Sequence, residues 1–346
     1  MKRINVLLCS AGRRPYLVKW FKEALTLNQL GGEVIVADAD LTAPAKAFAD
    51  GFLQAPPVED PAYRTWLLET IGQREISVAF SINDFELSTW ANLGEDDDEL
   101  NRLIRLSRQT QALAEDKLAM SHLLTSAGLT NPPTVLASAA ETLNGEAWVT
   151  KGRYGSGSRG LAFVSNEELS SAISRAVDEV TGPTGGKPRS LSEALDCLII
   201  QPRIEGQEYG LDVVADLDGN FAGVLARKKI AMRNGETDKA VSVDPAPFVD
   251  LARKLVGVLG HRGSVDVDVI QDANGDLSLI DINPRFGGGY PLSHLAGAHL
   301  PAAVVAWCAG LAPQSDWLQC EPGVVAAKYV EATVVPLVEA ELPDGG

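Results

Sequence analysis

The sequence is poor in cysteine and carries fewer basic than acidic residues. Its four cysteines (Cys9, Cys197, Cys308 and Cys320) lie far apart with no CxxC pair. This spacing excludes a zinc framework or a disulfide scaffold and indicates a reduced, cytoplasmic setting. Thirty basic residues against 46 acidic ones give a net charge of −16. Such a charge repels nucleic acid and anionic membranes, so neither is an expected partner.

Several common signatures are also missing. No apolar run reaches the roughly 18 residues of a membrane-spanning helix. Neither GxSxG nor HExxH occurs, which leaves hydrolytic triads and zinc chemistry without support. Gly186-Lys187 is followed by Pro188 and does not complete a P-loop.

The composition is that of a globular chain with two domains. The 346 residues are 45% hydrophobic and 22% charged. In roughly the first hundred residues, predicted strands at 5–9, 33–37 and 78–81 alternate with helical patterns, notably at 16–27. This alternation predicts an α/β domain with a parallel, Rossmann-like sheet. Later segments favour an α+β arrangement: Asp116-Lys117 opens a helix that ends at Gly128, residues 181–190 form a surface loop, and residues 292–311 are helical.

Residues 155–160 match GxGxxG, but the neighbouring segments do not fit a dinucleotide-binding motif. Strand-like residues stand on both sides, at 147–150 and 161–164. A dinucleotide fingerprint needs a helix after the glycines, so the segment is expected to be the tip of a hairpin. A surface hairpin without a ligand is one reading. Lys151 and Arg153 at its base favour the other, a flap over nucleotide phosphates.

The acidic segment 264–284 is the most informative part of the chain. Valines alternate with Asp266 and Asp268, and this period of two places both carboxylates on one face of a strand. Asn274-Gly275 is a strong hairpin signal and predicts a two-residue type I′ turn.

That turn would set the register of the hairpin. Asp268 is then expected opposite Asp281, and Asp266 opposite Asn283, so that three carboxylates and one amide oxygen share a face. Opposed like charges destabilise a sheet unless a cation lies between them. Hard oxygen donors predict Mg²⁺, with Mn²⁺ as a substitute.

The residues that follow favour this metal site over the alternative, a solvated acidic face. Arg285 comes directly after Asn283-Pro284 and shortly before Gly287-Gly288-Gly289. An arginine and a glycine-rich anion nest beside a magnesium site suit a phosphoryl group in transfer.

Together these features resemble the ATP-grasp ligases, most closely the branch similar to the carbamoyl-phosphate synthetase large chain. The resemblance covers residues 106–290, and the preceding residues resemble the family's first α/β domain. It implies a pre-ATP-grasp domain followed by a two-lobed ATP-grasp domain with antiparallel sheets. The implied divisions are residues 1–108, the smaller lobe at 109–200, the larger lobe at 201–335 and a tail at 336–346.

The resemblance also implies an ATP site. Lys117 and Lys151 match the two lysines that reach the phosphates. Gln201 stands near adenine where glutamate is commoner; its amide oxygen can still accept from the adenine amino group, and GTP stays open. Glu208 matches the acid on the ribose hydroxyls. The other implied nucleotide contacts are Gly155, Ser156, Gly157, Gly160 and the backbone of Arg203 and Ile204.

Metal and substrate roles follow from the same resemblance. The family's metal ligands match Asp268, Asp281 and Asn283, the trio that the hairpin register also predicts. Arg285 matches the arginine near the transferred phosphate. Residues 227–241 resemble the substrate and phosphate loop, although exposed charges without a role are an equal alternative there. The resulting candidates are Lys228 and Arg233 for catalysis, and Arg227, Glu236, Lys239, Asp266, Gly288 and Gly289 for substrate.

The implied activity is that of a carboxylate–amine ligase. It would act through an acyl phosphate on an amino acid or another small carboxylate, with a small amine as second substrate and a homodimer as a plausible assembly. Two alternatives stay open: a phosphotransferase that stops at phosphoryl transfer, and a catalytically silent nucleotide-binding or regulatory protein.

Overall fold

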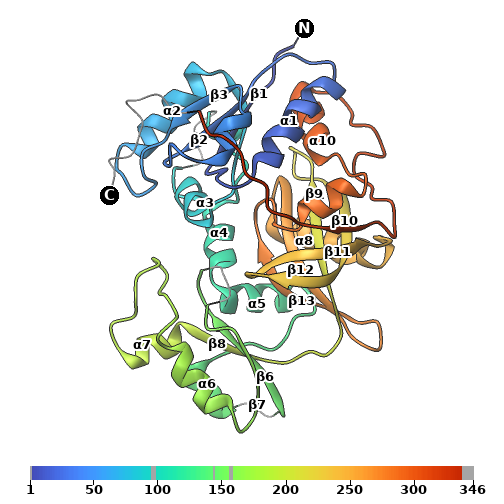
Figure 1. Ribbon diagram of the computed structural model, residues 1–346. Coiled ribbons are helices and arrows are strands. Elements are labelled where there is room, and N and C mark those ends of the chain that lie inside the picture. The colour runs from blue at the N-terminus through green and yellow to red at the C-terminus, as the bar shows by residue number, and fades with distance from the viewer. Residues whose placement is uncertain (1, 95–98, 143–144, 156–158, 337–346) are drawn as a thin grey trace.

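The computed structural model describes residues 2–94, 99–142, 145–155 and 159–336 (Figure 1). Within these ranges the strands form three sheets, one parallel and two antiparallel. The predicted mixed α/β fold is confirmed. No helix in these ranges combines the length and the apolarity needed to cross a bilayer.

The first sheet is parallel and has the order β3-β2-β1-β4. The strands predicted at 5–9, 33–37 and 78–81 and the helix at 16–27 are present, whereas the short, partly exposed β3 was not expected. The elements are β1 (Asn5–Cys9), α1 (Pro15–Leu27), β2 (Val34–Asp38), η1 (Pro44–Phe48), β3 (Gly51–Gln54), α2 (Tyr63–Gln73), β4 (Ile76–Ser81), α3 (Asp84–Ala91) and η2 (Leu100–Arg102).

Two helices follow the first sheet and lead to the smaller lobe, at the bottom of Figure 1. The lobe's antiparallel sheet has the order β5-β8-β6-β7, and the strands expected around the glycine-rich segment are confirmed as β6 and β7. Ser156 and Gly157 lie outside the described residues. The elements are α4 (Arg108–Glu115), α5 (Lys117–Ser126), β5 (Val135–Leu136), η3 (Ala137–Thr142), β6 (Ala147–Gly152), β7 (Ala162–Ser165), α6 (Leu169–Ala176), α7 (Leu191–Asp196) and β8 (Leu198–Pro202).

The larger lobe is built on a six-stranded antiparallel sheet with the order β13-β12-β9-β10-β11-β14. Helix α8 packs on one face, where its apolar side chains meet Val265, Val267 and Val269. The aspartates that alternate with these valines therefore face the other side. The elements are β9 (Gln207–Ala215), β10 (Phe221–Arg233), β11 (Glu236–Ser242), η4 (Ala246–Phe248), α8 (Val249–Leu259), β12 (Gly263–Gln271), β13 (Leu277–Asn283) and β14 (Val325–Ala327).

The turn of the β12–β13 hairpin differs from the prediction. Asp272 and Asp276 pair through a backbone hydrogen bond of 3.0 Å, so three residues rather than two form the loop. The Asp272 carboxylate accepts the backbone N–H groups of Asn274 (2.8 Å) and Asp276 (2.9 Å), and Gly275 adopts φ +90°. This is a three-residue loop with glycine at the left-handed position, so the predicted type I′ turn is wrong.

The expected pairing of the acidic residues is nevertheless present. Asp268 lies opposite Asp281 and Asp266 opposite Asn283. The register shifts next to Asp268, where Ile280 is an extra residue on β13. This bulge compensates the longer loop and restores the predicted alignment.

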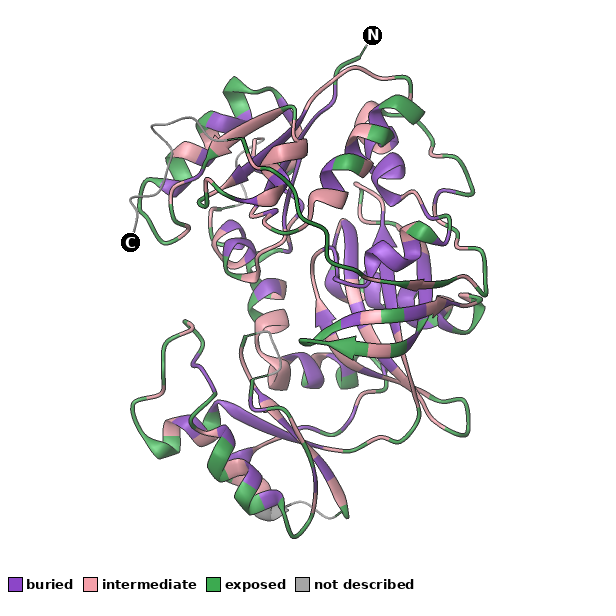
Figure 2. Cartoon of the chain, in the orientation of Figure 1, coloured by how far each residue is buried: buried purple, intermediate pink, exposed green. Residues whose placement is uncertain are grey.

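The helix expected over residues 292–311 is interrupted. Two helices, α9 (Tyr290–Leu295) and α10 (Leu300–Ala309), are separated by a break in which Gly297 has φ +108°. Helix α10 is buried along most of its length and packs beside α1 in one shared core (Figures 1 and 2). The domain divisions at residues 108, 200 and 335 stay a prediction, and this late helix packs with the first sheet.

Candidate active site

A pocket lies between α5, the sheet of the smaller lobe and strand β13. It contains four residues that the sequence predicted for the nucleotide and metal: Lys117, Lys151, Gln201 and Asp281. Apolar side chains line the remainder, among them Met120, Leu124, Leu279 and Ile282. Separate stretches of the chain thus bring the predicted nucleotide and metal residues to the lining of one small pocket.

Lys117 is the first residue of α5, and side-chain hydrogen bonds fix the start of this helix. The Asp116 carboxylate caps the helix by accepting two backbone N–H groups of its first turn at 3.1 and 3.2 Å. Arg153 donates to both oxygens of Asp116, at 2.8 and 2.6 Å. Burial raises the pKa of Asp116, but the Arg153 hydrogen bond and the cap outweigh it and leave the pKa below its usual range. Lys117 itself donates to the Gly155 carbonyl at 2.7 Å, at the base of the glycine-rich segment.

Lys151 reaches across to the larger lobe. Its ammonium donates to the carbonyl of Ile280 at 2.7 Å, so the bulge of β13 presents this oxygen to the lysine. Burial lowers the pKa of Lys151, while Asp281 raises it and Lys117 lowers it further. The two predicted phosphate lysines therefore lie near each other and near Asp281.

Gln201 is the second-last residue of β8, and its side-chain amide has a defined orientation. The Thr134 hydroxyl donates its proton to Pro132 O at 3.0 Å, so it can only accept from Gln201 Nε2 at 2.8 Å. The Gln201 amide oxygen is left as an acceptor, as an adenine amino group requires.

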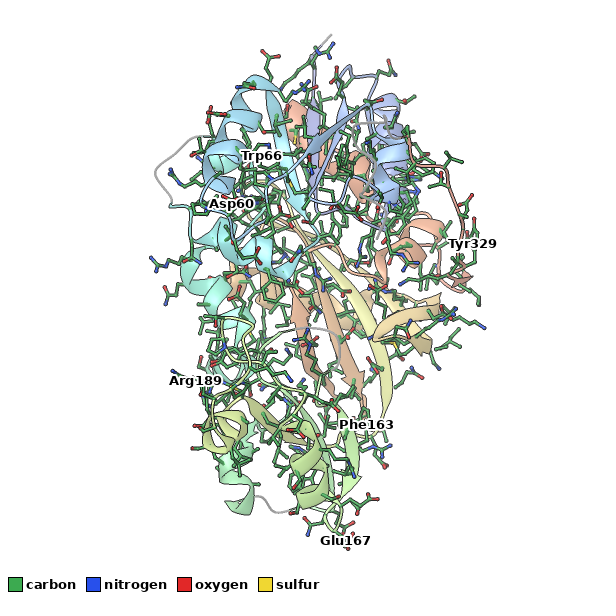
Figure 3. The ribbon with its side chains drawn as sticks, turned by 60° about the vertical axis from the view of Figure 1, so that its left-hand side comes forward. Asp60, Trp66, Phe163, Glu167, Arg189 and Tyr329 are labelled. Carbon is green, nitrogen blue, oxygen red and sulfur yellow. The ribbon has the colours of Figure 1, made fainter. Side chains whose placement is uncertain are left out.

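The next residues, Arg203 and Ile204, lie in the connection between β8 and β9. The Arg203 backbone N–H donates to Ala147 O at 3.0 Å, which leaves only its carbonyl for the predicted adenine contact. Its side chain is exposed and lies 5.8 Å from the ring of Phe163, which Figure 3 shows on the smaller lobe. Ile204 is half-buried.

Asp268 and Asp281 form the centre of the predicted metal site. Asn283 lies two residues along β13 and donates its Nδ2 to Asp281 Oδ2 at 3.3 Å, which leaves its amide oxygen free to accept. Among the described residues, no group of three or more His, Cys, Asp or Glu side chains could hold a metal. Two carboxylates and an amide oxygen still fit Mg²⁺, which usually takes one or two carboxylates together with waters and phosphates.

Lys229 on β10 was not predicted and contacts two of the predicted residues. Its ammonium lies 2.6 Å from Asp268 Oδ1 and 2.6 Å from Glu208 Oε1. Burial raises the pKa of Asp268 to about 7, against the opposing effect of Lys229. The pKa of Asp281 is lowered instead: burial raises it, but Lys117 and Lys151 outweigh that effect. A lysine in the run Arg227-Lys228-Lys229 gave no sequence signal beyond its charge.

Asp266, on the same strand as Asp268, takes part in a buried ion pair. Arg227, with 2% of its side chain exposed, lies 2.9 Å from Asp266 and 2.5 Å from Asp212. Ser293 donates to the same Asp212 oxygen at 2.8 Å. The Arg227 guanidinium therefore compensates the charge of Asp266 without a metal, and the predicted substrate roles of Asp266 and Arg227 stay predictions. Asp212 is a further residue that the sequence reasoning missed.

The glycine run packs directly on these charged side chains. A Cβ on Gly287 would lie 2.1 Å from Asp266 Cγ, and one on Gly289 would lie 2.2 Å from Arg227 Nη2. A Cβ on Gly288 would lie 2.6 Å from Glu236 Cδ. At Gly287 and Gly289 an added side chain would displace the Asp266–Arg227 ion pair, whereas at Gly288 the exposed Glu236 side chain could move.

The first sheet also contributes to the site. Arg285 Nε lies 2.7 Å from Asp84 Oδ1, at the first residue of α3. Arg14, after β1, lies 3.1 Å from Glu236, which also binds Lys328 at 2.7 Å. Arg14 and Asp84 follow the carboxyl ends of neighbouring parallel strands, where ligand sites of such sheets form. Their position after these strands is a signal that the sequence carries, although neither residue was predicted for the site.

The remaining candidates lie outside the pocket. Lys228, Arg233 and Lys239 are exposed on the β10–β11 hairpin. Their roles stay predictions.

Comparison with known families identifies the domain. Residues 114–289 match the family model described as an ATP-grasp domain. The chain belongs to the ATP-grasp family. The predicted resemblance, and with it an ATP-dependent enzyme of the ATP-grasp class, is confirmed. Residues 6–103 match a second family, the PylC-like N-terminal domain. The search of curated proteins gave no match.

Several solved structures share the fold at low sequence identity. N5-carboxyaminoimidazole synthetase from Staphylococcus aureus is 17% identical, with a TM-score of 0.67 over 94% of this chain and 82% of that one. Biotin carboxylase from Campylobacter jejuni is 18% identical, with a TM-score of 0.66 over 91% and 73%. L-amino acid ligase from Bacillus licheniformis is 15% identical, with a TM-score of 0.63 over 92% and 78%.

Proposed function

We propose that the protein is an ATP- and Mg²⁺-dependent ligase that joins a small carboxylate to an amine through an acyl phosphate. The observation that carries this proposal is the pocket in which Lys117, Lys151 and Gln201 meet Asp281, with Asp268 directly opposite on β12. The similarity in fold to N5-carboxyaminoimidazole synthetase and L-amino acid ligase supports it.

In this proposal, the chain's own groups bind and orient ATP. Gln201 accepts from the adenine amino group, Glu208 accepts from the ribose hydroxyls, and Lys117 and Lys151 bind phosphate oxygens. Asp268, Asp281 and Asn283 would hold Mg²⁺, with Mn²⁺ as a substitute. When bound, this cation neutralises charge that develops on the transferred phosphoryl group.

The other end of the site would handle the carboxylate and the amine. The substrate carboxylate attacks the γ-phosphorus, the bond to the β-phosphate oxygen breaks, and ADP leaves. The amine then attacks the acyl carbon and displaces phosphate. Arg285 and the backbone N–H groups of residues 287–289 would stabilise the oxyanion of this second step. An amino acid is the proposed carboxylate, in keeping with the similarity to the L-amino acid ligase.

The proposal is tested by ADP release. Amino acids are screened singly and in pairs with ATP and Mg²⁺, and hydroxylamine is added to trap intermediates. Release of ADP together with a hydroxamate supports an acyl phosphate, because an ordinary phosphate ester gives no hydroxamate. ADP release without hydroxamate would favour a phosphotransferase. Nucleotide binding without any substrate-dependent ADP release would favour a regulatory protein.

Location and assembly belong to the same proposal. Four cysteines without disulfide partners support a cytoplasmic enzyme. A homodimer stays a prediction, to be measured by light scattering.

A further inference from the structure

Glu236, which the sequence predicted for the substrate, joins two distant parts of the chain. Its Oε1 lies 3.1 Å from Arg14 Nη2, and its Oε2 lies 2.7 Å from Lys328 Nζ. Arg14 follows β1 in the first sheet, and Lys328 follows β14 at the edge of the larger lobe's sheet. Both basic residues lie outside residues 114–289, the part of the chain that matches the ATP-grasp domain. The two ion pairs therefore bring side chains from outside that domain to a predicted substrate residue.

This cluster lies beside the catalytic end of the proposed site. A Cβ on Gly288 would lie 2.6 Å from Glu236 Cδ, so the Glu236 carboxylate packs on the glycine run. Burial raises the pKa of Glu236, but its two basic partners and Arg285 outweigh it and leave the pKa below its usual range. A substrate whose reacting group is bound at Arg285 and the glycine run therefore has the cluster as its neighbour.

The cluster contains more positive than negative charge. Arg14 and Lys328 share one carboxylate, and within the described part of the chain neither forms an ion pair with another acid. The further partner of Arg14 is the Tyr16 hydroxyl, which accepts from Nη1 at 3.0 Å and is neutral. Two cations thus have one carboxylate between them, although the chain as a whole carries a net charge of −16. A partly buried cation without a full counter-charge favours an anionic ligand.

Both cations can be reached by such a ligand. The side chain of Arg14 is 16% exposed, that of Lys328 is 25% exposed and that of Glu236 is 50% exposed. A guanidinium has five N–H donors and an ammonium has three, which is more than these contacts occupy. An anion can therefore bind beside Glu236 without displacing it. Carboxylate and phosphate oxygens are the groups that arginine and lysine bind in this way.

We propose that Arg14 and Lys328 bind a second anionic group of the carboxylate substrate. The inference rests on the proposed function and narrows its substrate class: one carboxylate of the acid reacts, and a carboxylate or phosphate elsewhere in the same molecule is held by these two cations. Acidic and phosphorylated amino acids have this chemistry, and neutral amino acids lack it. Arg14 and Lys328 are thus specificity-determining residues.

The test compares amino acids that differ in this second charge. Glutamate is paired with glutamine and aspartate with asparagine, which have nearly equal sizes, and O-phosphoserine is paired with serine. Each acid is supplied with ATP, Mg²⁺ and hydroxylamine, which takes the place of the amine, and kcat/KM is measured for hydroxamate formation. At least one charged acid should exceed its neutral partner by about tenfold or more. The pair that shows this preference distinguishes a carboxylate from a phosphate as the second group.

Two variants assign this preference to the cluster. Arg14→Gln and Lys328→Gln should each lower kcat/KM for the preferred charged acid about tenfold more than for its neutral partner, through a higher KM. A defect of the fold alone would lower both partners alike. Lys328→Arg keeps the charge and should keep the preference. Arg64→Gln on α2 and Lys254→Gln on α8 remove exposed cations elsewhere and are the matched controls.

The outcomes separate the two proposals. If no acid, charged or neutral, yields a hydroxamate, the proposed function fails, and this inference fails with it. If the neutral acids react as efficiently as their charged partners, only the inference is overturned. A preference for the charged acid that is unchanged in a variant overturns the assignment of that residue. If neither variant folds, the wild-type pairs decide: a preference of about tenfold or more supports the inference, and equal efficiencies overturn it.

Discussion

Arg285 of the larger lobe is held by Asp84 of the first sheet domain, with 2.7 Å between Arg285 Nε and Asp84 Oδ1. Only 13% of the arginine side chain and 32% of the aspartate side chain are exposed. Asp84 is itself fixed, because it is the first residue of α3, whose start Asn83 caps by accepting the Phe85 N–H at 2.9 Å. The guanidinium proposed to act on the transferred phosphate is therefore oriented by the neighbouring domain.

Replacing Asp84 by Asn should slow turnover without changing nucleotide binding. The amide cannot pair with the guanidinium as an anion, so Arg285 loses its fixed position, and small displacements of a catalytic group cost about ten- to a hundredfold in rate. ADP formation measures the rate and ADP calorimetry the affinity. Glu69→Gln, at an exposed site on α2, is the matched control. An Asp84→Asn enzyme with full turnover would remove Asp84 from this role.

The β12–β13 hairpin shows what the sequence could predict and what it could not. The alternation of valine and aspartate predicted which face each side chain occupies, because that depends only on the period of a strand. The loop type was wrong, because the Asp272 side chain binds two backbone N–H groups and stabilises a longer loop. The Asp268–Asp281 pairing was correct only because the bulge at Ile280 offsets that longer loop. The bulge contacts Lys151, which is 129 residues away, and local sequence patterns do not report such a contact.

The basic residues that pair with the predicted acids could not be identified from the sequence. Motifs indicated Lys117, Lys151, Asp268 and Asp281, because their positions match a family pattern. Lys229, by contrast, acquires its position from the alignment of β10 beside β9 and of β9 beside β12. The ion pair between Asp266 and Arg227 on β10 depends on the same strand order and was not predicted either.

Replacing Asp281 by Ala should abolish metal-dependent ADP formation and leave the fold intact. Removing this carboxylate leaves Lys117 and Lys151 without their shared anion and deprives the metal of one of two carboxylates. ADP formation and far-UV circular dichroism are the measurements. Asp276→Ala, at the exposed tip of the same hairpin, should behave as wild type. Unchanged turnover in Asp281→Ala would exclude Asp281 from the metal site.

Replacing Gly287 by Ala should destabilise the protein. The added Cβ would lie 2.1 Å from Asp266 Cγ, so the loop or the buried ion pair must shift, at a cost of about 1–3 kcal/mol. Gly257→Ala is the matched control, because it adds the same methyl group to an exposed position of α8 with open space around it. That control should stabilise the helix by about 0.5–1 kcal/mol. Urea unfolding of both variants measures the difference, and equal stabilities would contradict the close packing at Gly287.

His261 should make the fold sensitive to mild acid. The ring is 1% exposed, and its Nε2 lies 3.1 Å from the carbonyl of Val213, so the neutral ring donates this hydrogen bond. Burial lowers the pKa of His261 from 6.5 to about 4, against the smaller opposing effect of the hydrogen bond. Between these values the unfolded chain binds a proton that the folded chain excludes, so the stability contribution is complete above pH 6.5 and is lost as the pH falls towards 4.

The free energy of unfolding should therefore drop by about 2 kcal/mol through His261 alone between pH 7.5 and pH 5. Urea unfolding at both pH values measures this drop in wild-type protein and in His261→Gln, where the contribution of His261 is removed. His122→Gln, at an exposed position on α5, is the matched control and should keep the wild-type dependence. The carboxylates shared by all three proteins titrate identically, so the difference in this drop between the proteins is due to the His261 ring. A drop in the free energy of unfolding of His261→Gln equal to that of the wild type would show that the buried histidine does not contribute.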